Sequence, residues 1–141
     1  EMAQNANNLG YVRSMQGCWR EAEGLCEEAV AGFTAAGATS RANNAQANLL
    51  TARFELLGLP DAVELEPEIL DVDAYYASEN DWRRRKTLVL LARLREHAGD
   101  LDIALDLMEK SLRLTRKVPT QHRLAHSREL RGRRRVTTNR S

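Results

Sequence analysis

The strongest constraint on the fold is an apolar pattern that occurs twice in the chain, at a constant offset of 82 residues. Residues 88–117 contain two amphipathic helical patterns that flank Gly99, and residues 3–33 follow the same plan about Gly17. The matched pairs are Leu9 with Leu91, Val12 with Leu94, Ala22 with Ala104, Leu25 with Leu107, Cys26 with Met108, and Val30 with Leu112. An apolar set that recurs at one offset across two helices and their turn is typical of a repeat protein. We therefore expect stacked helix pairs and no strand.

The repeated residues resemble the tetratricopeptide repeat family. The family's characteristic positions hold Leu9, Gly10, Gly17, Ala22 and Ala29 in the first copy and Leu91, Ala92, Gly99, Ala104 and Ser111 in the second. The family's period is about 34 residues, whereas half of the observed offset is 41, so the chain is similar to a long-period variant. The resemblance implies an all-α fold: an α-solenoid of about three antiparallel helix pairs with a partial C-terminal helix. It also implies a fragment of a larger bacterial regulatory or signalling protein, because such proteins often contain these arrays.

The repeat frame divides the chain into two parts. Residues 1–118 hold three repeats, at about 3–37, 39–78 and 80–117, and residues 119–141 hold a capping helix and a basic tail. Pro119 ends the last repeat because the residue before a proline is disfavoured in a helix.

The middle repeat follows the pattern only in part. Thr39 and Ser40 can cap a helix that runs to Leu57. Its second helix is expected to break at Pro67, because a proline inside a helix costs about 3 kcal/mol. We expect a short helix over residues 61–65 and another that Pro67 opens.

An acidic run, residues 61–73, lies in this middle repeat. Clustered carboxylates can bind calcium, but the run has no glycine for the tight turn that a calcium loop needs. We expect a solvated helix face instead.

Composition excludes several classes of protein. No apolar run approaches the roughly 20 residues that span a bilayer, and the chain does not open with a leader pattern. The sequence therefore favours a cytoplasmic protein, with Cys18 and Cys26 reduced. A glycine-rich phosphate loop, a nucleophile elbow and a His-Glu-x-x-His motif are all absent from the sequence. Neither an enzyme nor a cofactor is expected.

The C-terminal region offers one candidate metal site. His122, His126 and Glu129 are spaced by four and three residues, which puts them on one helical face. Imidazoles at this spacing can bind zinc, but two of them without a further strong ligand nearby do not define a site. A solvated helix is the favoured interpretation, and no metal is expected.

Arginine runs support an alternative function. Arg83, Arg84, Arg85 and Lys86 form one run, and residues 131–135 form a second. Clustered cations contact phosphates, so the chain could be a fragment of a transcriptional regulator that touches nucleic acid through its basic C-terminus. Against this, the net charge is only +1, and the first run could pair with the acidic run instead. Nucleic acid is therefore the alternative and not the expected partner.

The resemblance implies a partner-binding groove on the concave side, lined by the first helix of each pair. The groove residues that we select are Asn7, Tyr11, Asn48, Lys86, Arg93 and His97. Their amides can pair with a peptide backbone and their cations with its carboxylates. The expected function is a scaffold or regulatory module that binds a protein or peptide, with no membrane partner and with its oligomeric state open.

The chain departs from one subset of the family. Chaperone-binding members clamp a carboxylate with a lysine and an asparagine at two groove positions, where this chain has Asn7 and Tyr11. That specific activity is not expected, whereas Arg93 can hold a carboxylate through two parallel hydrogen bonds or pair with Glu55 or Glu96.

The repeat frame predicts that Ala22 and Ala104 lie at close helix crossings. Replacing Ala104 with Leu should therefore lower the free energy of unfolding by about 1 to 3 kcal/mol through overpacking. Chemical denaturation measures this change, and an unaltered midpoint and slope would mean that the frame is misplaced.

Overall fold

The computed structural model describes residues 1–77 and 81–119, and within them all regular structure is helical. The helices are α1 (Met2–Met15), α2 (Trp19–Ala35), α3 (Thr39–Leu57), α4 (Glu66–Ala77), α5 (Arg85–His97) and α6 (Leu101–Thr115), with 3-10 turns η1 (Asp61–Leu65) and η2 (Trp82–Arg84). The all-α prediction is confirmed for this part of the chain. The expected capping helix and basic tail, from residue 120 onward, lie outside the described residues.

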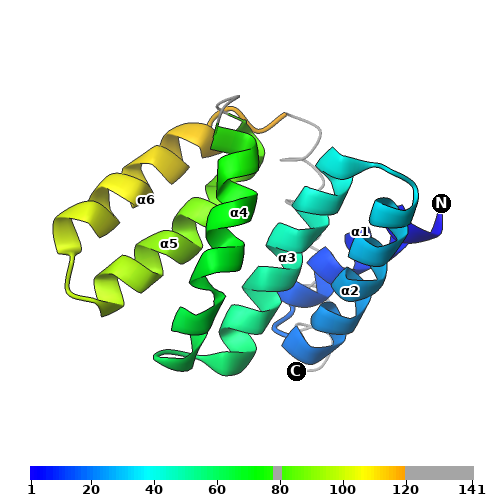
Figure 1. Ribbon diagram of the computed structural model, residues 1–141, viewed down its shortest axis with the longest axis horizontal. Coiled ribbons are helices and arrows are strands. Elements are labelled where there is room, and N and C mark those ends of the chain that lie inside the picture. The colour runs from blue at the N-terminus through cyan, green and yellow to red at the C-terminus, as the bar shows by residue number, and fades with distance from the viewer. Residues whose placement is uncertain (78–80, 120–141) are drawn as a thin grey trace, which may run out of the picture.

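The helices lie side by side in chain order, from α1 and α2 at one end to α6 at the other (Figure 1). Helix α1 packs on α2, α2 on α3, and α5 on α6, while α4 contacts both α3 and α5. Each element is therefore held mainly by its neighbours in sequence.

Three helices end in the same kind of turn, at Gly17, Gly37 and Gly99. Their φ angles are 76°, 70° and 90°, a left-handed conformation that residues with a side chain adopt only at a cost. Each glycine N–H donates to the carbonyl three residues back, and the next N–H donates to the carbonyl five residues back, at 2.9 to 3.1 Å. This is the Schellman motif, which satisfies the last carbonyls of a helix. The predicted equivalence of the Gly17 and Gly99 turns is confirmed.

Pro67 interrupts the middle repeat as the sequence predicts. η1 ends at Leu65, and α4 begins at Glu66, so that Pro67 lies in the first turn of α4. A proline is tolerated there because the N–H that it lacks has no partner within the helix.

Three helix boundaries differ from those expected. Thr39 was expected to cap α3, but Ala38 is the N-cap, with no capping side chain. The Ala38 N–H closes the Gly37 turn, and α3 begins at the next residue, Thr39. The third pair opens with η2 and not directly with an α-helix, and the Asp81 side chain caps it by accepting from the Arg83 N–H at 2.9 Å. Helix α6 ends at Thr115, two residues before the predicted end at residue 117.

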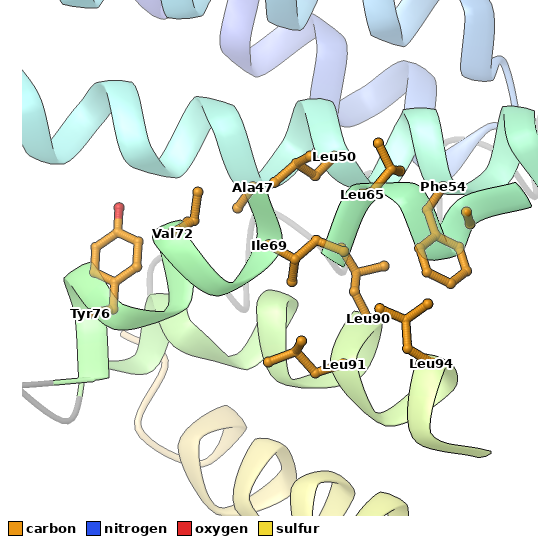
Figure 2. Close-up of a cluster of buried hydrophobic side chains, with 11 residues drawn as sticks. Ala47, Leu50, Phe54, Leu65, Ile69, Val72, Tyr76, Leu90, Leu91 and Leu94 are labelled. Carbon is orange, nitrogen blue, oxygen red and sulfur yellow. The ribbon is translucent and has the colours of Figure 1, made fainter. Parts of the chain in front are cut away.

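Two clusters of buried side chains form the core. The larger cluster joins α3, η1, α4 and α5, and Figure 2 shows its leucines and Phe54 pointing toward one another between these elements. At its edge Tyr76 donates a hydrogen bond to the Ser40 carbonyl at 2.9 Å, and burial raises the pKa of Tyr76 to about 12. The smaller cluster, in α1, α2 and α3, contains four alanines and Phe33. Ala22 and Ala104, predicted at close crossings, are both buried.

One acid of the acidic run is not solvated. Asp73 is buried, and its carboxylate accepts hydrogen bonds from the Arg84 Nε at 2.9 Å and from the Thr87 hydroxyl at 2.8 Å. The prediction of a solvated face is therefore wrong at this position, because η2 supplies the Arg84 donor and α5 supplies the Thr87 donor. The alternative that the arginine run pairs with the acidic run is confirmed for Arg84.

Gly10 permits the close approach of α1 and α2. A Cβ at Gly10 would lie 2.8 Å from the Cys26 Sγ and 3.3 Å from the Leu25 Cβ. The Cys26 side chain is fully buried.

Gly10→Ala should therefore destabilise the protein by about 1 to 2 kcal/mol, since overpacking outweighs the gain in helix propensity. Gly24→Ala is the matched control: a Cβ at Gly24 meets nothing within 4 Å, so this change should stabilise by about 0.5 to 1 kcal/mol. Urea denaturation measures both. Adding Cys26→Ala should reduce the cost of Gly10→Ala, and a Gly10→Ala variant more stable than wild type would contradict the close approach.

Candidate functional site

Two buried amides join the first and second helix pairs. Asn7 lies in α1 and Asn48 in α3, 41 residues later, and the Asn48 Nδ2 donates to the Asn7 Oδ1 at 3.1 Å. Both residues are buried. The amides are therefore satisfied partly by each other, at equivalent heights on neighbouring helices.

Lys86, in the first turn of α5, completes this group. Its Nζ donates to the Asn48 Oδ1 at 2.7 Å and lies 5.2 Å from the centre of the Tyr11 ring, within range of a cation–π interaction. Four predicted site residues from three helices thus come together: Asn7, Tyr11, Asn48 and Lys86. We call them the amide–lysine cluster.

The cluster encloses a positive charge. Although Lys86 as a whole is only half-buried, its amine is enclosed by protein, and this desolvation lowers the pKa of Lys86 to about 7, with a smaller contribution from the adjacent Arg85. Burial also raises the pKa of the Tyr11 hydroxyl, which Arg85 partly opposes. The Lys86 amine is therefore easily converted between its charged and neutral forms near neutral pH.

The thiol of Cys26, in α2, is also enclosed by protein. Burial raises the pKa of Cys26 to about 11, and the opposing effect of Lys86 is smaller. Cys26 is therefore a small core residue, and a thiol with a raised pKa is a poor nucleophile.

Arg85 is a second cation beside the cluster. Its guanidinium lies 4.9 Å from the centre of the Trp82 ring and donates to the Trp82 carbonyl at 3.2 Å. Burial lowers the pKa of Arg85, and the Ser111 hydroxyl of α6 donates to the Arg85 carbonyl at 3.0 Å. Within residues 1–77 and 81–119, no carboxylate forms an ion pair with Arg85 or Lys86.

The other two predicted site residues lie apart from the cluster. Arg93 forms an ion pair with Glu55, and its guanidinium lies 4.4 Å from the centre of the Phe54 ring. The sequence allows Arg93 to pair with either Glu55 or Glu96, and the structure shows the pair with Glu55. His97 is exposed at the end of α5, and nothing described connects it to Lys86.

Two of the four cations of the first arginine run are neutralised. Arg83 pairs with Asp81, and Arg84 pairs with Asp73. The second run, residues 131–135, lies outside the described residues. So does the histidine pair of residues 122 and 126, and no group of His, Cys, Asp or Glu in the described ranges could hold a metal ion.

Comparison with known proteins adds no assignment: no protein-family model, curated protein or solved structure matches the chain. In the part of the chain that the structure describes, no helix has the length and apolar character to cross a membrane. The site therefore has to be interpreted from its own residues.

Sequence reasoning missed Arg85 as a member of the site. The sequence placed it within a run of four cations, where nothing separates paired from unpaired side chains. Only the positions of Asp73 and Asp81 show that Arg83 and Arg84 are used in ion pairs and that Arg85 is not.

The lowered pKa of Lys86 makes stability depend on pH. Between about pH 7 and the ordinary value of 10.5, the unfolded chain keeps a proton on Lys86 that the folded chain has released. The unfolded state then binds more protons, so the free energy of unfolding rises with pH in this window. Relative to Lys86→Met, wild type should therefore gain stability from pH 7 to pH 10 and show no relative change below pH 6.

Urea denaturation of both proteins across this pH range measures the difference. Lys110→Met is the matched control, because Lys110 pairs with Asp106 at 3.3 Å on the outer part of α6. This variant keeps Lys86, so its stability should still rise from pH 7 to pH 10. If the Lys86→Met curve were parallel to that of wild type, the amine would not be desolvated.

Proposed function

We propose that the chain is a protein-binding module that holds an acidic peptide segment against the amide–lysine cluster. The observation that carries this proposal is the pair of enclosed cations, Lys86 and Arg85, neither of which forms an ion pair with a carboxylate of the described residues; Asp81, which pairs with Arg83, acts on Arg85 from beyond ion-pair distance. An enclosed charge without a counter-charge is costly. A carboxylate from a ligand would remove that cost, so affinity and selectivity for an acid come from the same two side chains.

The proposal includes a tetratricopeptide-like solenoid. The identical turns at Gly17, Gly37 and Gly99, together with contacts mainly between neighbouring helices, are features of stacked helix pairs. In such an array α1, α3 and α5 would line the concave side, and these are the helices that supply the cluster. The array would be the regulatory or scaffold part of a larger protein.

The ligand that fits is an extended segment with a side-chain or terminal carboxylate. Lys86 and Arg85 can bind its acid, and the buried amides of Asn7 and Asn48 hold the Lys86 amine in place. Arg93 is not the anchor in this proposal, because Glu55 already neutralises it. Nucleic acid is the weaker candidate, since two arginines of the first run are held in ion pairs.

A peptide library provides the test. Each sequence is presented with a free C-terminal carboxylate and, in parallel, as the C-terminal amide, with and without internal Asp and Glu. We expect binding only to peptides that carry an acid, and a loss of about tenfold or more for Lys86→Met and for Arg85→Gln. Arg53→Gln is the matched control, because Arg53 pairs with Glu23 and Glu27 of α2, and it should bind as wild type does.

The pH dependence gives a second readout. Since only protonated Lys86 attracts a carboxylate, affinity should fall about tenfold from pH 6 to pH 8 in wild type and stay flat in Lys86→Met. Binding that survives Lys86→Met, falls steeply with salt and disappears when residues 131–141 are removed would contradict the proposal and favour contact with nucleic acid through the basic tail.

A further inference from the structure

Helix α6 carries an exposed apolar stripe that adjoins its packed side. Leu101, Leu105, Met108 and Leu112 are spaced by four, three and four residues, so they lie on one face of the helix. Their exposed fractions are 64%, 60%, 45% and 56%. The packed side consists instead of Ala104, Leu107, Ser111 and Leu114. Figure 1 shows α6 at one edge of the row of helices, with α5 beside it.

The equivalent face of α2 shows what such a stripe requires. Cys26 and Val30 occupy the positions of Met108 and Leu112 at the 82-residue offset. Cys26 is fully buried, with Gly10 of α1 against its thiol, and Val30 is partly buried where α3 packs on α2. Where α2 has Glu23, which pairs with Arg53 of α3 at 3.4 Å, α6 has Leu105. The exposed apolar face of α6 is therefore more apolar than the equivalent face of α2, on which α3 packs.

Charges along α6 are divided between its two halves. Residues 100–109 contain four acids and no base, and residues 110–117 contain four bases and no acid. Most of these side chains are exposed. Two such helices that lie antiparallel place the acidic half of each beside the basic half of the other, and they also oppose their helix dipoles.

We infer that this face binds a second copy of the same chain, with the two α6 helices antiparallel about a two-fold axis. The axis passes between Leu105 and Met108, so that Leu101 faces the partner's Leu112 and Leu105 faces the partner's Met108. The stripe is about 17 Å long at 1.5 Å per residue. A two-fold interface needs a self-complementary surface, and a stripe with opposite charges at its two ends is one. This surface is separate from the amide–lysine cluster and does not depend on the proposed peptide binding.

Sedimentation equilibrium of the full chain across a micromolar concentration series tests the inference. We expect a species of twice 15.9 kDa, with the dimer weakened by at least about tenfold in Leu105→Glu/Leu112→Glu. Both side chains are exposed, so the helical circular dichroism of the variant should not change. Leu70→Glu is the matched control, because Leu70 is 47% exposed on α4, and it should dimerise as wild type does.

Charge exchange tests the antiparallel direction. Asp102→Arg should weaken the dimer, and adding Arg113→Glu should restore it, because the two positions face each other across the axis. A chain that is monomeric at every concentration would overturn the inference, as would a dimer that Leu105→Glu/Leu112→Glu leaves intact. If methyl NMR of the monomer places Leu105 and Met108 against residues 120–141, that segment covers the stripe and the second copy does not.

Discussion

The arrangement of this protein depends on a tight reversal of the chain after α1, α2 and α5. Each reversal needs a left-handed residue that closes two hydrogen bonds onto the helix before it, and glycine supplies that conformation without steric cost. Because the reversals are equally short, consecutive helices lie antiparallel and in contact. Small residues at the contact, such as Gly10 against Cys26, then set how near the helices come.

The amide–lysine cluster follows from this regular stacking. Asn7 and Asn48 meet because corresponding positions of α1 and α3 lie beside each other, and Lys86 reaches the same amide from α5. A polar group inside a helical array has to be satisfied by polar neighbours, and here one asparagine side chain serves two partners. What the described residues do not supply is a negative charge, so the cluster combines well-ordered amides with an unneutralised amine.

Much of the fold could be predicted from the sequence, because periodicity and glycine positions act locally. The constant offset between the first and third pairs predicted equivalent turns, and Pro67 predicted the break between η1 and α4. Side-chain partners could not be predicted in the same way, since they depend on how helices pack. Asp73 looked like part of a solvated run, Arg93 could equally anchor a ligand or pair within the chain, and Arg85 looked like an ordinary member of a basic run.

The hydrogen bond from the Ser111 hydroxyl to the Arg85 carbonyl connects two surfaces that otherwise look independent. It fixes the first turn of α5 from the side of α6, one residue before Lys86. Among the described residues, helix α6 lies at the end of the row and packs mainly on α5, so local opening costs little there. Any contact that holds α6 in place also keeps the backbone at Arg85 ordered. The positions of Arg85 and Lys86 therefore depend in part on α6, at the end of the row of helices.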